Sequence, residues 1–208
     1  MLMKLIRKGA EGDIFLTAWI NQKAILKSRK KKDYRNESLD YHLRKQRTIR
    51  ESEIMSEVKK FRIHTPLVYF VDVENCNIIM QEINGALARD ISNSKLVRIC
   101  KDIGKSVGIM HKNGIAHGDL TTSNFIISKE DMFIIDFGLA SRTSKFDDHA
   151  VDLRLFKEIL NSAHIEVFEK AWSNFLSGYK SSVGKERFVK VTNQVMVIES
   201  RGRYAAVV

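Results

Sequence analysis

Two short polar motifs in the second half of the chain carry side chains suited to binding a metal-bound nucleotide. The first runs from His117 to Asn124 and contains Asp119, and the second is Asp136-Phe137-Gly138. Mg²⁺ prefers a few hard oxygen ligands from the protein and keeps phosphate and water ligands, and Asn124 and Asp136 can supply those oxygens. Asp119 then remains available to orient a hydroxyl group or a water molecule that attacks a phosphate. The two motifs therefore predict magnesium–nucleotide chemistry, with Asn124 and Asp136 as metal ligands.

The elements expected around these motifs divide the chain into a β-rich first part and a helical second part. Apolar runs predict a hairpin over residues 14–27 and strands over residues 67–73, 78–80, 125–127 and 133–135. Helical spacing is found over residues 38–61 and 96–110, and helical periodicity dominates from residue 151 onward. We expect a compact α+β protein with an N-terminal lobe of residues 1–84 and a helical C-terminal lobe of residues 85–208, which together form one domain.

Composition narrows the class of protein further. The chain has 208 residues and a formal net charge of +10, which favours a polyanionic partner such as a nucleotide or a nucleic acid. Only two cysteines are present, which excludes a disulfide framework and a four-cysteine zinc site and favours the reducing cytoplasm. Because no apolar run approaches the roughly 20 residues that span a bilayer, we expect no membrane segment.

The motifs resemble the catalytic loop and the D-F-G triplet of protein kinases. This resemblance implies ATP and Mg²⁺ as cofactors and Asp119 as a catalytic residue. Lys27, which ends the apolar run that begins at Ala24, matches the kinase lysine that binds the nucleotide phosphates. Gly118 stands where regulated kinases carry an arginine that binds a phosphorylated activation loop, so we do not expect that form of regulation.

The kinase lysine requires a carboxylate on the long helix, where Glu51 and Glu53 are alternatives. The apolar face of this helix is expected to contain Leu39, Leu43, Ile54, Val58 and Phe61. Glu51 and Glu53 each lie about 80° from the centre of that face, on opposite sides, so periodicity alone leaves the choice nearly even. Flanking Met55 and Val58 favour Glu51 as the partner of Lys27.

Two further segments are assigned to nucleotide binding by their position. Gly9-Ala10-Glu11-Gly12 is an incomplete copy of a glycine-rich phosphate loop and precedes the strand that carries Lys27. Met80, Glu82 and Ile83 lie at the expected lobe boundary, where backbone groups of kinases pair with adenine.

One element of ordinary protein kinases is missing. Pro66 is the only proline, so the A-P-E motif that closes the activation segment is excluded. The helical pattern resumes soon after Gly138, which leaves little surface for docking a peptide. We therefore expect ATP hydrolysis, autophosphorylation or action on a bound partner.

A more specific resemblance extends over nearly the whole chain. The N-terminal blocks that carry it are Lys27-Ser28-Arg29, Lys32-Asp33-Tyr34-Arg35, Leu39-Asp40, Leu43-Arg44 and Arg47-Thr48-Ile49-Arg50-Glu51. The later blocks are residues 80–85, 117–124, 136–138 and 150–152 and the tail Ser200-Arg201-Gly202-Arg203-Tyr204. Together they resemble the small kinase/ATPase subunit of the KEOPS complex of archaea and eukaryotes, and this match favours Glu51 over Glu53.

This second resemblance implies an atypical Ser/Thr kinase and ATPase that supports N6-threonylcarbamoyladenosine formation in tRNA and can autophosphorylate. Its partners would be the transferase subunit, other KEOPS subunits and tRNA. Asp152 would brace the catalytic loop. The basic residues from Arg29 to Arg50, together with Arg201 and Arg203, would face tRNA phosphates or the transferase.

Three alternatives remain open from the sequence. A RIO-type kinase is also small and lacks A-P-E, but the intact Asp136-Phe137-Gly138 motif and the Arg47–Glu51 block argue against it. Small-molecule phosphotransferases share the catalytic-loop pattern but usually have a larger C-terminal lobe. A non-catalytic tRNA-binding scaffold of kinase fold would not need the full set of Lys27, Glu51, Asp119, Asn124 and Asp136.

Overall fold

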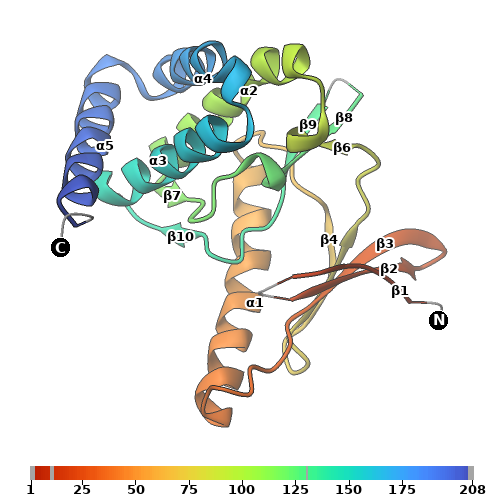
Figure 1. The fold of residues 1–208 in the computed structure, drawn as a ribbon. Coiled ribbons are helices and arrows are strands. Elements are labelled where there is room, and N and C mark those ends of the chain that lie inside the picture. Colours follow the sequence, from red (N-terminus) through yellow and green to blue (C-terminus); the bar gives the residue numbers. More distant parts are fainter. Residues whose placement is uncertain (1–2, 10–11, 130, 206–208) are drawn as a thin grey trace. The chain divides into compact units, whose positions relative to one another are not determined.

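The computed structural model describes residues 3–9, 12–129 and 131–205 and has the expected mixed α+β composition (Figure 1). Two compact units are present. Unit 1 contains residues 1–84 and 133–139, and unit 2 contains residues 85–132 and 140–208. The segment 133–139, which the sequence-based division places in the C-terminal lobe, therefore packs with unit 1. Among the described residues, the structure contains no helix that is long and apolar enough to cross a membrane.

Unit 1 is built on an antiparallel five-stranded sheet with the order β1-β2-β3-β5-β4. Its strands are β1 (Lys4–Lys8), β2 (Asp13–Trp19), β3 (Gln22–Ser28), β4 (Val68–Asp72) and β5 (Asn77–Gln81). The predicted hairpin is β2–β3, and its turn residues Ile20 and Asn21 have φ values of 46° and 62°, as a two-residue type I′ turn requires. Strand β1 was not predicted, because its side chains are all exposed and show no apolar alternation.

Helix α1 (Glu37–Lys59) packs against β4 and β5, beside the sheet in Figure 1. The side chain of Asn36 caps its N-terminus by accepting hydrogen bonds from the backbone amides of Ser38 and Leu39. The expected apolar face is wrong at this end of the helix, because Leu39 is 54% exposed. The buried residues that precede Ile54 are polar instead, namely Asp40, Thr48 and Glu51. Apolar burial begins only at Ile54, so the part of α1 before Ile54 is held by polar contacts.

Unit 2 consists mainly of helices. They are α2 (Asn93–Lys112), α3 (Phe146–Ala163), α4 (Phe168–Val183) and α5 (Lys185–Ala205), with short 3₁₀ helices η1 (Ala88–Asp90), η2 (Thr122–Asn124) and η3 (Ile165–Val167). Two small sheets accompany them, β10-β7 and β6-β8-β9, formed by β6 (Ala86–Leu87), β7 (Ile115–Ala116), β8 (Phe125–Ser128), β9 (Asp131–Ile134) and β10 (Ser141–Arg142). The 3₁₀ helix η2 forms the C-terminal end of the predicted catalytic loop, and strand β8 directly follows it.

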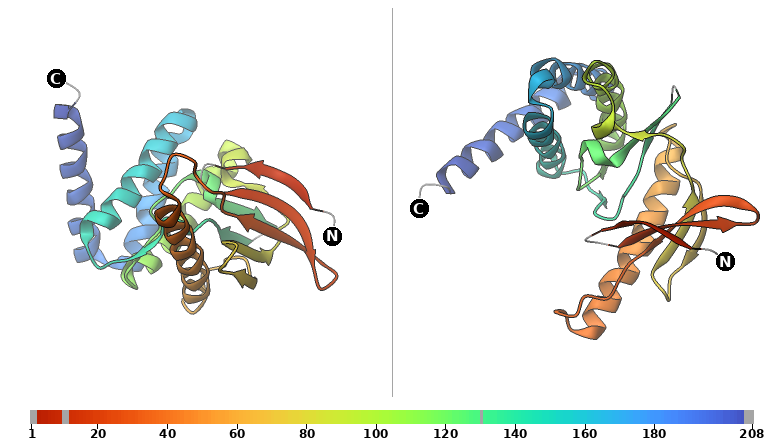
Figure 2. Two further views of the ribbon diagram at one scale, coloured as in Figure 1. Left: turned by 90° about the horizontal axis from the view of Figure 1, so that it is seen from below. Right: turned by 45° about the vertical axis from the view of Figure 1, so that its right-hand side comes forward.

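Helices α2 and α4 approach each other closely through glycine. A Cβ atom on Gly178 would lie 1.9 Å from the carbonyl oxygen of Lys101, and one on Gly104 would lie 2.0 Å from that of Phe175. Fully buried aromatic side chains fill the interior beside this contact, including the stacked rings of Phe156 and Phe175. Helix α5 packs on α3 and α4, and its C-terminal half extends beyond the other helices of unit 2 in both views of Figure 2.

Candidate active site

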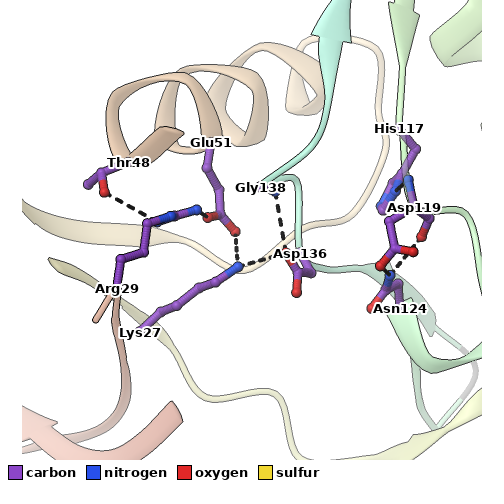
Figure 3. Close-up of polar contacts among 9 residues, drawn as sticks. All are labelled: Lys27, Arg29, Thr48, Glu51, His117, Asp119, Asn124, Asp136 and Gly138. Atoms are coloured by element: carbon purple, nitrogen blue, oxygen red, sulfur yellow. Dashed lines mark hydrogen bonds and ion pairs between the residues drawn. The ribbon is translucent and has the colours of Figure 1, made fainter. Parts of the chain in front are cut away.

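The predicted lysine of unit 1 lies between two carboxylates (Figure 3). The Nζ atom of Lys27 is 2.8 Å from Oε1 of Glu51 and 2.7 Å from Oδ1 of Asp136. Lys27 is 4% exposed and Glu51 is 1% exposed, whereas the side chain of Asp136 is 43% exposed. The expected pairing of Lys27 with Glu51 is therefore present, and Glu53 is an exposed residue of the same helix.

The secondary structure explains why these side chains meet. Lys27 is near the end of β3 and is paired with Ile78 of β5, so its side chain is directed by a strand with neighbours on both sides. Glu51 lies one turn before Met55 on the buried side of α1, which packs on the same sheet. Asp136 follows β9 with a φ of 62°, and its Oδ1 accepts a hydrogen bond of 3.3 Å from the backbone amide of Gly138. The close turn at the D-F-G triplet thus brings the carboxylate to Lys27.

The charges around Lys27 keep it protonated despite its burial. Burial alone would lower the pKa of an amine, because it disfavours the charged form. The carboxylates of Glu51 and Asp136 outweigh that effect, and the pKa of Lys27 lies above its ordinary value. A permanently charged ammonium group suits an anionic ligand such as phosphate.

A second cation, which the sequence analysis assigned to a tRNA-facing surface, belongs to this cluster. Arg29 is only 3% exposed, and its Nη2 atom forms an ion pair with Oε2 of Glu51. Its Nη1 atom donates a hydrogen bond of 3.3 Å to the hydroxyl of Thr48. A Cβ atom on Gly138 would lie 3.1 Å from Nη2, so glycine leaves room for the guanidinium at this position. The spacing of Lys27 and Arg29 by two residues on an extended strand was the available signal, since such residues share a face.

The catalytic-loop motif forms a separate polar cluster in unit 2. The side-chain nitrogen of Asn124 donates to the backbone oxygen of Asp119 at 2.7 Å and to its Oδ2 at 3.0 Å (Figure 3). The backbone amide of Asp119 donates to Nδ1 of His117 at 3.4 Å. The loop is therefore closed on itself, with the Asp119 carboxylate held by the amide that stands five residues later.

Asp152 of α3 holds this loop through its backbone amides, as the resemblance implied. Its Oδ2 accepts a 2.6 Å hydrogen bond from the backbone amide of His117, and its Oδ1 accepts a 2.8 Å bond from that of Gly118. Nε2 of His111 lies 3.1 Å from the same carboxylate, and Nδ1 of His111 lies 3.0 Å from the hydroxyl of Tyr179. All three of Asp152, His111 and Tyr179 are fully buried, so the loop is anchored to the interior of unit 2.

The protonation of this buried group is set by burial and hydrogen bonding together. Burial would raise the pKa of Asp152, but hydrogen bonds and charge from His111 and the His117 amide hold that pKa below its ordinary value. Burial lowers the pKa of His111. A neutral His111 that donates from Nε2 to ionised Asp152 and accepts at Nδ1 from Tyr179 satisfies all of these contacts. His149 stacks on His111 with ring centroids 4.2 Å apart, and burial lowers its pKa to about 3.

The remaining predicted ligands lie in or beside the sheet of unit 1. Gly9 follows β1 and Gly12 precedes β2, and the Gly9 amide donates to the Gly12 carbonyl at 3.1 Å. Ala10 and Glu11 lie outside the described residues. Met80 is buried in β5, and Glu82 and Ile83 follow that strand with half-buried side chains. Nucleotide binding by these seven residues stays a prediction.

The expected basic surface is smaller than the sequence suggested. Arg29 is buried, which removes it from any surface that contacts RNA. Five other basic residues of the same stretch face carboxylates of this chain in the pairs Lys30–Asp13, Lys31–Glu37, Arg35–Asp40, Arg44–Asp40 and Lys45–Glu74. Arg50 is exposed on α1, and Arg201 is exposed near the end of α5, the helix that also contains the backbone of residue 203.

Comparison with known protein families shows which family the chain resembles. The protein kinase domain family matches residues 2–170 of the chain. In fold, the chain is similar to the Rio2 kinase of Chaetomium thermophilum in an ADP/Mg²⁺–phosphoaspartate complex, with a TM-score of 0.65 over 94% of this chain and 70% of that one. The two sequences are 15% identical, so this likeness concerns the fold alone.

Closer relatives are found among curated sequences. The chain is 44% identical over 200 residues to a probable bifunctional tRNA threonylcarbamoyladenosine biosynthesis protein of Methanocaldococcus jannaschii. That alignment covers 96% of this chain but 37% of the relative, so the chain spans little more than a third of such bifunctional proteins. The chain is also 37% identical over 212 residues to the KEOPS complex subunit Bud32 of Pyrococcus abyssi. That alignment covers 97% of this chain and 96% of the relative.

The match to the kinase family covers more than half of the chain, and the match to the Pyrococcus subunit is nearly full-length for both proteins. The chain therefore belongs to the protein kinase domain family and, within it, to the Bud32 family of KEOPS complex subunits.

Proposed function

We propose that this protein binds Mg-ATP and transfers or releases the terminal phosphate, as an atypical kinase and ATPase. The observation that carries this proposal is the buried ammonium group of Lys27, which two carboxylates hold in place at 2.8 and 2.7 Å. A buried amine fixed in this way presents a positive charge with little loss of side-chain freedom on binding phosphate. Glu51 would orient Lys27, and Lys27 would bind the nucleotide phosphates.

The residues present fit a bound Mg²⁺ ion. Asp136 supplies a carboxylate that is 43% exposed, and Asn124 directs its side-chain nitrogen at Asp119, which leaves the amide oxygen as its metal-binding atom. Carboxylate and amide oxygens are ligands that Mg²⁺ accepts. We propose Asn124 and Asp136 as the metal ligands. When bound, the ion would neutralise charge on the phosphate oxygens.

Asp119 is proposed as the catalytic residue that orients the attacking group. Its carboxylate is restrained by Asn124 at 3.0 Å, and its loop is anchored through two backbone amides to Asp152. An anchored carboxylate can accept a hydrogen bond from a hydroxyl group or a water in a fixed direction, which is the positioning that phosphoryl transfer requires. Gly9, Gly12, Ala10 and Glu11 would cover the phosphates, and the backbone near Met80, Glu82 and Ile83 would bind adenine.

We infer that the biological setting is tRNA modification. The relatives' names place them in the KEOPS complex and in threonylcarbamoyladenosine biosynthesis. By that relationship this protein would support the same modification together with a transferase subunit, other KEOPS subunits and tRNA, in the cytoplasm, with autophosphorylation as a further activity. On this chain the exposed Arg50 and Arg201 are the proposed contacts to RNA or to the transferase.

ATP turnover by the purified chain, alone and with its complex partners, tests the proposal. Turnover should require Mg²⁺ and should fall by at least about 100-fold in Lys27→Met, which removes a positive charge at the phosphates, and in Asp136→Asn, which removes the charge of a proposed metal ligand. Glu53→Gln, on the exposed side of α1, is the matched control and should keep normal turnover. Normal, magnesium-dependent turnover by Asp136→Asn would show that the site is wrongly assigned, and absence of turnover in every preparation would favour a scaffold.

A further inference from the structure

Glu51 differs from a simple lysine partner because each of its carboxylate oxygens contacts a different cation. Oε1 accepts from Lys27 at 2.8 Å, and Oε2 pairs with Nη2 of Arg29 (Figure 3). Lys27 lies near the end of β3, Arg29 is the first residue after that strand, and both side chains contact α1. Two positive side chains from neighbouring positions therefore contact one buried carboxylate.

Arg29 is itself held at both ends. Its guanidinium spans one turn of α1, because Nη1 donates to Thr48 while Nη2 contacts Glu51 three residues later. Its backbone amide donates to the carbonyl of Cys76 at 3.2 Å, and its own carbonyl accepts from Nη1 of Arg44 at 3.4 Å. Arg29 thus links the sheet to the middle of α1, where Thr48 and Glu51 are buried.

The charges of the cluster indicate what the Arg29–Glu51 contact does when a phosphate group binds to Lys27. Lys27 and Arg29 carry two positive charges, and Glu51 and Asp136 carry two negative charges, so the cluster is neutral without a ligand. If Lys27 turns its ammonium group toward phosphate, Glu51 loses contact with one cation. If a buried carboxylate loses its only cation, the free energy of unfolding falls by several kcal/mol. Arg29 prevents that loss, because its guanidinium remains charged at all physiological pH values and binds carboxylates through a rigid fork.

Resting on the proposed function, in which Lys27 binds phosphate, we propose that Arg29 is a positioning residue that holds Glu51 and the middle of α1 in the arrangement that orients Lys27. In kinases that arrangement is often set by the activation segment and by movement of the helix that carries the glutamate. Here the link is internal to unit 1 and involves Lys27, Arg29, Thr48, Glu51 and Gly138. The lysine–glutamate pair then forms without phosphorylation of the short segment after Gly138.

Arg29→Met and Arg29→Lys in the full chain test this role, with Asn36→Ala as a control. Asn36→Ala removes the cap of α1 and costs about 1 kcal/mol of stability without touching the cluster. Arg29→Met should lower kcat about 10- to 100-fold, as expected when a catalytic group is misplaced by about 1 Å. Arg29→Lys should recover part of the loss, and Asn36→Ala should keep kcat within about twofold.

A double-mutant cycle with Glu51→Gln separates positioning from general stability. If Arg29 acts through Glu51, Arg29→Met should have little further effect on kcat in the Glu51→Gln background. If Arg29→Met lowers kcat by the same factor in both backgrounds, Arg29 contributes independently of Glu51 and the proposed role is overturned. An unchanged kcat in Arg29→Met would overturn it as well.

Hydrogen exchange of the unliganded chain gives a readout that does not depend on ATP turnover. Arg29→Met should speed exchange of the backbone amides around Thr48 and Glu51 at least about tenfold, whereas Asn36→Ala should affect only the first turn of α1. Unchanged exchange at Thr48 and Glu51 would show that Arg29 does not hold the helix. A second outcome separates this role from the proposed function. If Arg29→Met speeds exchange but the unmodified chain neither binds nor hydrolyses ATP, Arg29 still holds the helix and the proposed function is refuted.

Discussion

The replacement Glu51→Gln gives a quantitative test of the buried charge cluster. Glutamine has nearly the same shape as glutamate but carries no charge, so it leaves Lys27 and Arg29 buried with Asp136 as the remaining carboxylate of the cluster. Lys27 and Arg29 are 4% and 3% exposed, so water cannot replace the lost carboxylate. Removing one partner of a buried ion pair costs about 3–5 kcal/mol. Because the glutamine oxygen still accepts one hydrogen bond, we expect the lower end, about 3 kcal/mol.

Urea unfolding followed by far-ultraviolet circular dichroism measures this loss. With a denaturant dependence of about 2–3 kcal/mol per molar urea, a loss of about 3 kcal/mol should move the midpoint down by about 1 M. Glu53→Gln, an exposed neighbour on α1, should move the midpoint by less than about 0.2 M. If Glu51→Gln unfolds at the same urea concentration as the unmodified chain, the cluster does not contribute as its burial and distances imply. If Glu53→Gln is the damaging change, the register of α1 is wrong.

Three further predictions concern other parts of the chain. The pKa of His149 is lowered to about 3 in the folded state from 6.5, so the stability it contributes is complete above pH 6.5 and is lost as the pH falls toward 3. Thermal unfolding at pH 7 and pH 5 should reveal a loss of about 2 kcal/mol from this group, and His149→Gln should flatten that dependence. Gly178→Ala should destabilise the chain by about 3 kcal/mol in urea, because its Cβ would meet the Lys101 carbonyl, whereas the exposed Ser177→Ala should have almost no effect. Arg50→Ala should weaken binding of all tRNAs about equally and reduce the slope of log affinity against log salt by about 1 in filter-binding assays, and an unchanged slope would exclude Arg50 as a phosphate contact.

The parts of the site that the sequence predicted correctly depend on motifs more than on periodicity. Lys27 was identified by its match to the kinase lysine, and helical periodicity left Glu51 and Glu53 nearly even until the family resemblance favoured Glu51, which is the residue that pairs with Lys27. The Asp119–Asn124 loop was also recognisable, because both residues lie within one short segment between a helix and a strand. Their catalytic roles stay predictions until they are measured.

Two of the incorrect expectations, those for Arg29 and Leu39, share one physical cause. Arg29 was counted with a surface charge run, and Leu39 was placed on the buried face of α1, because charged residues are usually exposed and apolar residues usually buried. In this helix the ion pairs of Asp40 with Arg44 and of Glu51 with Arg29 let polar side chains occupy the buried face. The Asp40–Arg44 pair lies within one helix, but only the tertiary structure shows that Arg29 reaches Glu51 on α1.

The most direct test of the central claim is an experimental structure of the chain with Mg²⁺ and a non-hydrolysable ATP analogue. We predict a phosphate oxygen within hydrogen-bonding distance of Nζ of Lys27 and a Mg²⁺ ion bound by the side chains of Asn124 and Asp136. Glu51 should still contact Arg29 in that complex. A nucleotide bound elsewhere, or a phosphate group that contacts neither Lys27 nor a metal ion held by Asp136, would contradict the account.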